Sequence, residues 1–311
     1  MRSRTTLLAV VCLAAVSAFA ASGCKSAEIF DQFPKASRDF SRLLEKASLG
    51  DPNAQFEAGL AYETGVGTEQ DYGEAVGWYR KAADHGDPGS QNNLGGLYSR
   101  GLGVPQDDAM AMKWYLRAAL AGYPAAENNV GFMYANGRAA EQDNKSAVSW
   151  YRKAAAQGYA AAETNLGYMY ANGRGVATDP KEAVKWYRKA AKRGYAPAQF
   201  NLGLMYLQGN GITQQLGEAL GWLRQAAGHG LATAENQLGV LYEHGQGVAA
   251  DYAAAAKWYR LAAQHGSVQA KNNLESLDAA RGISQASPAS HDPSITASTS
   301  DLKSSASQTI Q

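Results

Sequence analysis

A glycine and a tryptophan each recur every 36 residues along this chain, and this period constrains the fold more than any other feature. The glycines are Gly59, Gly95, Gly131, Gly167, Gly203 and Gly239. The tryptophans are Trp78, Trp114, Trp150, Trp186, Trp222 and Trp258, and the chain of 311 residues contains no others. A fixed period of about 20 to 50 residues is the signature of a solenoid, in which each repeat packs mainly on its neighbours.

Each repeat is predicted to form two helices, which we call helix A and helix B, as residues 87–122 illustrate. Asp87 is followed by a proline, which predicts an N-capped start of helix A over 88–100. Gly101 predicts a left-handed residue that ends this helix. Asp107 then predicts the cap of helix B, and a second glycine ends the repeat.

The recurring glycine lies in the middle of helix A, where glycine costs about 0.5–1 kcal/mol relative to alanine. Its recurrence therefore predicts a close approach of the two helices. On helix B, the paired Ala118 and Ala119 are expected to face Gly95, so that small residues meet small residues. Trp114 and Tyr115 are expected to supply most of the buried area, about 150–250 Å² each.

The helix-B caps recur as well. Counterparts of Asp107 are Asp71, Asp143, Asp179 and Asp251. In the fourth repeat, Glu182 follows the cap by three residues and predicts a capping box with Asp179. The fifth repeat departs from the pattern, because Gln215 stands at the cap position.

These patterns predict an all-α fold, an α/α superhelical solenoid of six 36-residue helix pairs in a right-handed superhelix. Its repeats are predicted at about 51–86, 87–122, 123–158, 159–194, 195–230 and 231–266. A capping helix is predicted at each end of the solenoid (51–282). Arg42 replaces the tryptophan in the helix predicted over 35–50, and Glu275 and Asp278 replace glycine and tyrosine in the one over 267–282. The Ser-, Ala- and Thr-rich segment 283–311 is predicted to be disordered.

Residues 1–23 are predicted to be a signal peptide. Arg2 and Arg4 precede an apolar run over 7–21 that is shorter than the about 20 residues a membrane-spanning helix needs. The run ends in Ala21-Ser22-Gly23-Cys24, which resembles the lipobox of bacterial lipoproteins and implies lipidation of Cys24.

The lipobox resemblance implies a membrane-bound protein, with residues 24–34 as the tether. By analogy with enteric bacteria, Lys25 after the cysteine implies the periplasmic side of the outer membrane. The alternative is cleavage after Ala18-Phe19-Ala20, which would give a secreted or soluble periplasmic protein.

The repeat motif resembles the Sel-1-like repeat, a relative of the tetratricopeptide repeat, over about residues 51 to 282. The matching positions of the fourth repeat are Ala162, Leu166, Gly167, Tyr170, Gly173, Gly175, Val176, Asp179, Ala183, Trp186, Tyr187, Ala190, Ala191 and Gly194. The resemblance implies a solenoid that acts as an adaptor in protein complexes, often in the bacterial envelope. The motif residues are structural and imply a fold, not a site.

Three columns of residues are expected on the concave face that helix A presents. One column is Asn93, Asn129, Asn165, Asn201, Gln237 and Asn273. The second contains Phe132, Tyr168, Leu204 and Val240, and the third Arg100, Asn136, Asn172, Gln208 and His244. Amides can bond the backbone of an extended peptide while aromatic rings supply buried area. The candidate partner-binding residues are Asn129, Phe132, Asn136, Asn165, Tyr168, Asn172, Asn201 and Leu204.

Structural explanations for the same columns stay open. The asparagines could bond the backbone of the adjacent repeat and hold the stack together. The column of Phe132 and Tyr168 could instead pack between repeats.

The sequence offers no catalytic, metal or cofactor site. Cys12 and Cys24 are the only cysteines, so the repeats contain no disulfide framework and no thiolate metal site. His85, His229 and His265 end helix B in three repeats and are expected to be exposed. The net charge of +1 argues against a nucleic-acid partner, and the basic run Tyr187-Arg188-Lys189 with its equivalents is expected to be the solvated side of helix B.

The favoured function is therefore a non-enzymatic scaffold with protein or peptide partners, anchored to the membrane through Cys24. An alternative is a peptidoglycan- or glycan-binding envelope protein. A β-lactamase-like hydrolase, suggested by a cysteine-rich branch of the family, is less favoured: the paired cysteines are missing and the Ser22-x-x-Lys25 match lies in the signal region.

Overall fold

The computed structural model describes residues 35–280, and within them the chain is all-α with no strand. These described residues divide into two compact units, one ending at Gln142 and the other beginning at Asp143. Several predicted features lie outside the described residues: the signal peptide 1–23, the tether 24–34 with Cys24, and the tail 283–311.

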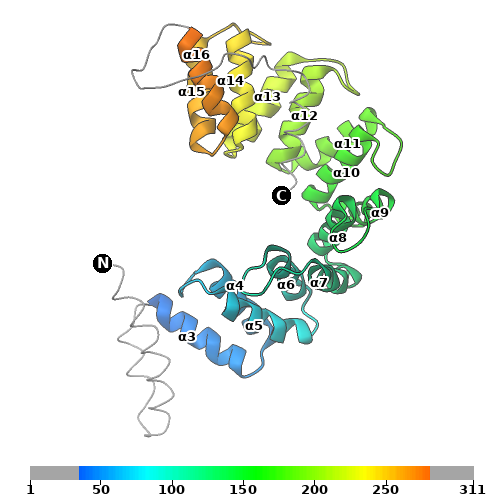
Figure 1. Cartoon of the computed structure of the whole chain (residues 1–311), viewed down its shortest axis with the longest axis vertical. Helices are drawn as coiled ribbons and strands as arrows, with labels where there is room; N and C mark the ends of the chain where they lie inside the picture. The colour runs from blue at the N-terminus through cyan, green and yellow to red at the C-terminus, as the bar shows by residue number, and fades with distance from the viewer. Residues whose placement is uncertain (1–34, 281–311) are drawn as a thin grey trace. The chain divides into compact units, whose positions relative to one another are not determined.

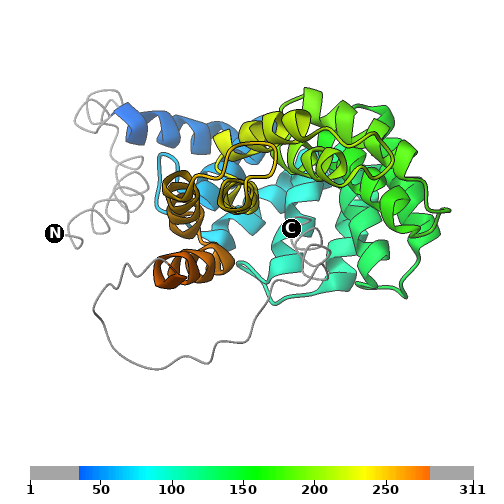
Figure 2. The same cartoon turned by 90° about the horizontal axis from the view of Figure 1, so that it is seen from above.

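Fourteen helices follow one another along the described chain (Figure 1). The first unit contains α3 (Lys35–Ser48), α4 (Pro52–Thr64), α5 (Tyr72–Asp84), α6 (Pro88–Arg100), α7 (Asp108–Leu120) and α8 (Pro124–Asn136). The second contains α9 (Asn144–Ala156), α10 (Ala160–Asn172), α11 (Pro180–Lys192), α12 (Ala196–Gln208), α13 (Leu216–Gly228), α14 (Ala232–His244), α15 (Tyr252–Gln264) and α16 (Val268–Ala280). Seen at a right angle in Figure 2, the same helices are joined by short loops. The all-α solenoid predicted from the period is confirmed.

The helix boundaries follow the cap residues. Helix α6 covers the range predicted for it, and Gly101 after it is left-handed at φ 68°. The Asp107 side chain accepts a hydrogen bond from the Met110 N–H at 2.9 Å and caps α7 as predicted. Gln215 makes no side-chain cap bond to α13, so the fifth repeat lacks this contact.

The predicted capping box of α11 is only half formed. The Asp179 carboxylate accepts from the Glu182 N–H at 3.0 Å. The Asp179 N–H instead donates to the Tyr170 carbonyl at 2.9 Å, which ties the loop to the end of α10. The Glu182 carboxylate therefore has no donor to reach back to, and it accepts from Lys185 at 2.7 Å.

The expected contact of small residues with small residues is wrong. A Cβ on Gly95 would lie 2.6 Å from the Tyr115 ring, so the glycine makes room for an aromatic ring of helix B. Tyr79 packs in the same way on Gly59, and Leu223 takes the ring's place at Gly203. The alanines Ala118 and Ala119 are buried, but they do not determine this approach.

The capping helices behave as predicted at both ends. Ala47 of α3 is buried with Ala54 and Trp78, whereas Arg42 is exposed. At the other end, Leu277 of α16 is buried against α15, and Glu275 is exposed. Each terminal helix thus covers the neighbouring repeat with one face and leaves the other in water.

Candidate functional site

The helix-A surface consists of the sixth, ninth and thirteenth residues of α4, α6 and α8 in the first unit, and of α10, α12, α14 and α16 in the second. The first unit carries Asn129, Phe132 and Asn136 of the candidate residues, and the second carries the other five. Asn136 and Asn172 are exposed; Asn129, Phe132 and Tyr168 are half-buried; Asn165, Asn201 and Leu204 are buried.

Two asparagines of the sixth position bridge neighbouring repeats through their side chains. Asn129 Nδ2 donates to Asn92 Oδ1 at 2.9 Å in the first unit. Asn273 Nδ2 donates to Asn236 Oδ1 at 3.0 Å in the second. In these two contacts the acceptor is a side chain on the preceding helix A, not the backbone that the sequence suggested. Position five, which sequence reasoning overlooked, therefore supplies the acceptors.

The exposed amides of the thirteenth position are oriented by their own helix. Asn136 Nδ2 donates to the Phe132 carbonyl at 2.8 Å, and Asn172 Nδ2 donates to the Tyr168 carbonyl at 2.9 Å. Each bond ties the amide nitrogen to a backbone carbonyl one turn earlier in the same helix. It also fixes the amide so that its oxygen can accept a hydrogen bond from outside.

An apolar row lies beside these amides in the second unit. It consists of Tyr168, Leu204 and Val240, the ninth residues of α10, α12 and α14. Leu204 is 8% exposed, and its two neighbours in the row are half-buried. The surface thus combines accessible apolar area with hydrogen-bond acceptors.

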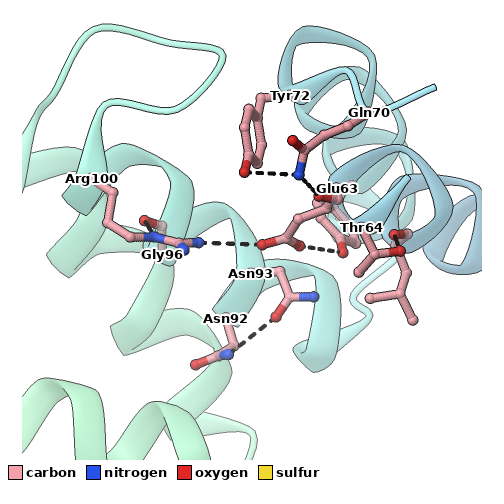
Figure 3. Close-up of polar contacts among 10 residues, drawn as sticks. Glu63, Thr64, Gln70, Tyr72, Asn92, Asn93, Gly96 and Arg100 are labelled. Atoms are coloured by element: carbon pink, nitrogen blue, oxygen red, sulfur yellow. Dashed lines mark hydrogen bonds and ion pairs between the residues drawn. The ribbon is translucent and has the colours of Figure 1, made fainter. Parts of the chain in front are cut away.

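A polar network lies beside the helix-A surface of the first unit and includes Asn93 and Arg100 of that surface (Figure 3). The Tyr79 hydroxyl donates to Glu63 Oε2 at 2.7 Å, and Arg100 Nη2 lies 3.2 Å from Glu63 Oε1. Next to it, Asn92 Nδ2 donates to Asn93 Oδ1 at 3.3 Å. Burial raises the pKa of Tyr79, and the hydrogen bond to Glu63 raises it further, so the hydroxyl keeps its proton and remains a donor.

The second unit contains the same tyrosine–glutamate pair. The Tyr259 hydroxyl donates to Glu243 Oε2 at 2.6 Å, and burial again raises the pKa of the tyrosine. The pair was missed at the sequence level because its glutamate is present in only the first and sixth repeats. The pair could have been predicted from the sequence, because Glu63 and Glu243 are separated by five whole periods and so occupy equivalent positions.

A buried polar residue occupies the fourth position of helix A. Gln91 and Gln199 donate from Nε2 to the carbonyls of Ala83 and Ala191 at 3.2 and 3.3 Å. Glutamate takes this place in three repeats. A carboxylate has no N–H group, so a buried glutamate here cannot donate to the backbone carbonyl that the glutamine side chain reaches.

Two of these glutamates meet a basic side chain from the end of helix B in the same repeat. The Glu235 carboxylate is fully buried, and both of its oxygens lie 2.9 Å from His265 Nδ1. Glu163 lies 3.7 Å from Arg193, and burial raises its pKa. His265 is exposed as expected, but it also contacts the buried acid beneath it, which needs a partner.

The described residues offer little other chemistry. They contain no group of three or more histidine, cysteine, aspartate or glutamate side chains that could hold a metal ion. None of their helices is long and apolar enough to cross a membrane. A hollow of about 620 Å³ at the loop before α15 contains one acid, Asp251, whose carboxylate caps that helix.

The pattern described as Sel1 repeat matches residues 52–87, 88–123, 124–159, 160–195, 196–231 and 232–267. The crystal structure of a Sel1 repeat protein from Oxalobacter formigenes is 32% identical with a TM-score of 0.69, and the match covers 73% of this chain and 91% of that one. No curated protein matches the chain.

Two further solved structures are similar. A protective antigen of uropathogenic Escherichia coli strains, which displays an SLR fold, is 32% identical with a TM-score of 0.55. The match covers 79% of this chain and 61% of the antigen. An immunity protein from Pseudomonas aeruginosa, 23% identical with a TM-score of 0.51 over 69% of this chain and 81% of that one, shares the fold.

Proposed function

The chain belongs to the Sel1 repeat family, and from that premise we propose that it is a scaffold of the bacterial cell envelope that binds extended peptide segments of its partners on the helix-A surface. Proteins built from Sel1 repeats generally mediate protein–protein interactions and are typically non-catalytic. The peptide class, the surface and the location are our proposals.

One observation carries the peptide proposal. In the second unit, the apolar row of Tyr168, Leu204 and Val240 lies beside the exposed amides Asn172 and Gln208. An extended peptide has alternating side chains that can cover such a row, and backbone N–H groups that need acceptors. The bond from Asn172 to the Tyr168 carbonyl holds its amide oxygen ready for this role.

Burial favours a peptide over a glycan. Sugar hydroxyls require several accessible amides, whereas Asn165 and Asn201 are 7% and 8% exposed. A glycan would therefore find acceptors mainly in the single row of thirteenth residues. Sedimentation with purified peptidoglycan distinguishes the two classes, since pelleting that depends on Tyr168 would favour the glycan.

Site-specific cross-linking in cells tests the peptide proposal. A photo-reactive benzoyl-phenylalanine in place of Asn172 is expected to give a protein adduct. The same group in place of Ser149, an exposed residue of helix B, serves as the matched control. Adding Tyr168→Ala and Gln208→Ala is expected to abolish the adduct at position 172 while circular dichroism shows intact helices.

The cross-linking experiment can also reject the proposal. Equal adducts at positions 149 and 172 would mean that the labelling is not specific to the helix-A surface. An adduct that persists in the folded Tyr168→Ala, Gln208→Ala variant would place the partner elsewhere.

The envelope location rests on the lipobox-like segment before Cys24. We expect the wild-type chain to incorporate labelled palmitate and to fractionate with membranes, and Cys24→Ser to lose both properties. If palmitate is not incorporated and the chain is soluble, cleavage after Ala20 is the better description.

A further inference from the structure

The helix-B face of α9 and α11 carries a concentration of positive charge that the proposed function does not use. The two helices contain eight cationic side chains and one acid. These cations, which we call the basic patch, are Lys145, Arg152, Lys153, Lys181, Lys185, Arg188, Lys189 and Lys192. By contrast, α5 and α13 each contain equal numbers of acids and bases.

Helical geometry places these cations on one face of each helix. On α11 they recur at spacings of three and four residues, while Ala183, Tyr187 and Ala190 are buried on the other side. The period of 36 brings Lys145 and Lys181 to equivalent places on α9 and α11. The ends of the two helices are adjacent, because Arg193 after α11 donates to the Gly158 carbonyl after α9 at 3.1 Å.

The acids at the edge of the basic patch are already engaged. Asp143 and Asp179 accept hydrogen bonds from the first turns of α9 and α11. Glu182 pairs with Lys185 at 2.7 Å. Even with these three acids counted against its eight cations, the patch carries an excess of positive charge.

The composition of the patch determines what kind of surface it fits. A stereospecific protein interface usually centres on a buried aromatic or aliphatic anchor. The large exposed apolar residues of the described chain are elsewhere, at Leu49, Leu60, Val66, Leu120, Tyr252 and Val268. The tryptophans of the two helices lie beneath cations instead, with Lys153 Nζ 3.8 Å from the Trp150 ring centroid and Lys189 Nζ 3.9 Å from that of Trp186.

We propose that the basic patch is a docking surface for anionic phospholipid headgroups. A membrane leaflet presents diffuse negative charge without a fixed shape, and this matches exposed lysines that surround no exposed apolar anchor. The proposal rests in part on the envelope location proposed above, since a lipid-anchored chain would have such a leaflet within reach. It assigns α9 and α11 to the membrane and leaves the helix-A surface for partners.

Vesicle co-sedimentation tests this proposal. The full chain carries Cys24→Ser in every sample. Acylation therefore plays no part, and the predicted signal peptide contributes the same background binding in every sample. The vesicles are either pure phosphatidylcholine or an equimolar mixture with phosphatidylglycerol. We expect the chain to partition more strongly onto the anionic vesicles and to be released by salt.

The patch variant replaces Lys145, Lys181 and Lys192 with glutamine. The matched control makes the same change at Lys113, Lys257 and Lys271, which lie on α7, α15 and α16. We expect the patch variant to lose on the order of a hundredfold in partitioning onto anionic vesicles, since each lysine near such a surface contributes roughly one factor of five. The control is expected to lose far less.

Other outcomes overturn the proposal. Equal losses in the patch variant and the control would mean that net charge alone drives binding. Equal binding to both kinds of vesicle would mean that headgroup charge is irrelevant. Retention on immobilised RNA, lost in the patch variant and without any preference for anionic vesicles, would assign the patch to a nucleic acid. Cross-linking at position 172 reports separately on the helix-A surface.

Discussion

At the scale of single residues, the mid-helix glycine determines how closely helix A approaches helix B. A Cβ on Gly95 would lie 2.6 Å from two carbons of the buried Tyr115 ring, and the surrounding core leaves the ring little room to move. We expect Gly95→Ala to lower the free energy of unfolding by about 1–3 kcal/mol, the usual cost of overpacking a core. Urea unfolding followed by circular dichroism measures the change.

Gly77 provides the matched control. It lies inside α5, and a Cβ there would have no neighbour within 4 Å. Gly77→Ala is expected to raise the free energy of unfolding by about 0.5–1 kcal/mol through helix propensity alone. A stabilising Gly95→Ala would contradict the close packing of glycine against tyrosine.

A second residue-scale prediction concerns the buried Glu163. Burial raises its pKa in the folded state, so its contribution to stability is most favourable when it is protonated and falls as the pH rises through that pKa. We expect Glu163→Gln to raise the free energy of unfolding at neutral pH by up to about 1 kcal/mol, because the amide is neutral and can donate to the end of the preceding helix B. The gain is expected to shrink in acid, and urea unfolding at the two pH values measures it.

The reverse substitution is the control. Gln91 donates to the Ala83 carbonyl, and Ala121 stands where Arg193 and His265 supply basic side chains in other repeats. Gln91→Glu therefore buries a carboxylate without a cation there and is expected to cost about 1–3 kcal/mol. If Gln91→Glu is harmless, the fourth position tolerates charge and the explanation for Glu163 fails.

At the scale of single helices, the cap of α13 is the weakest of the helix-B starts. Gln215 has the extended backbone of a cap, with φ −144° and ψ 97°, but its side chain bonds no N–H of the first turn. We expect Gln215→Asp to raise the free energy of unfolding by about 1 kcal/mol, by adding the contact that Asp251 makes to Ala254. Thermal unfolding of the two single variants is the measurement: Gln215→Asp is expected to gain stability, and Asp251→Ala is expected to lose a similar amount. A gain from both substitutions would contradict the role of the caps.

The helices could be predicted from the sequence because their boundaries depend on local chemistry. Asp107 and Gly101 specify the start of one helix and the end of another without reference to distant residues.

Contacts that depend on three-dimensional register were harder to find. The pairing of Glu235 with His265 joins residues 30 apart, and neither residue recurs in every repeat. The binding role of the candidate residues stays a prediction, since the sequence fixes their columns but not their burial.

At the scale of the whole molecule, the repeats make the chain modular. Within each unit the helices contact mainly their neighbours in sequence, so removing one complete period within the second unit preserves the kinds of contact that remain. Deleting residues 160–195 joins Tyr159 to Ala196. A tyrosine therefore still precedes Ala196, as Tyr195 does in the intact chain. We expect this deletion to keep the mean ellipticity per residue and to lower the urea midpoint, because one nearest-neighbour interface is lost. Circular dichroism and urea unfolding measure the two quantities.

Deleting residues 160–177 is the decisive control, because it removes half of a period. It would place α11 directly after α9, so that two helices with the helix-B pattern follow each other and no helix-A glycine receives the Tyr187 ring. The buried tyrosine and alanine face of α11 would then lack its complementary surface, and we expect lost ellipticity and aggregation. If both deletions fold equally well, the helices are interchangeable and the 36-residue pair is not the folding unit. If neither folds, the stability of this chain depends on contacts beyond neighbouring repeats.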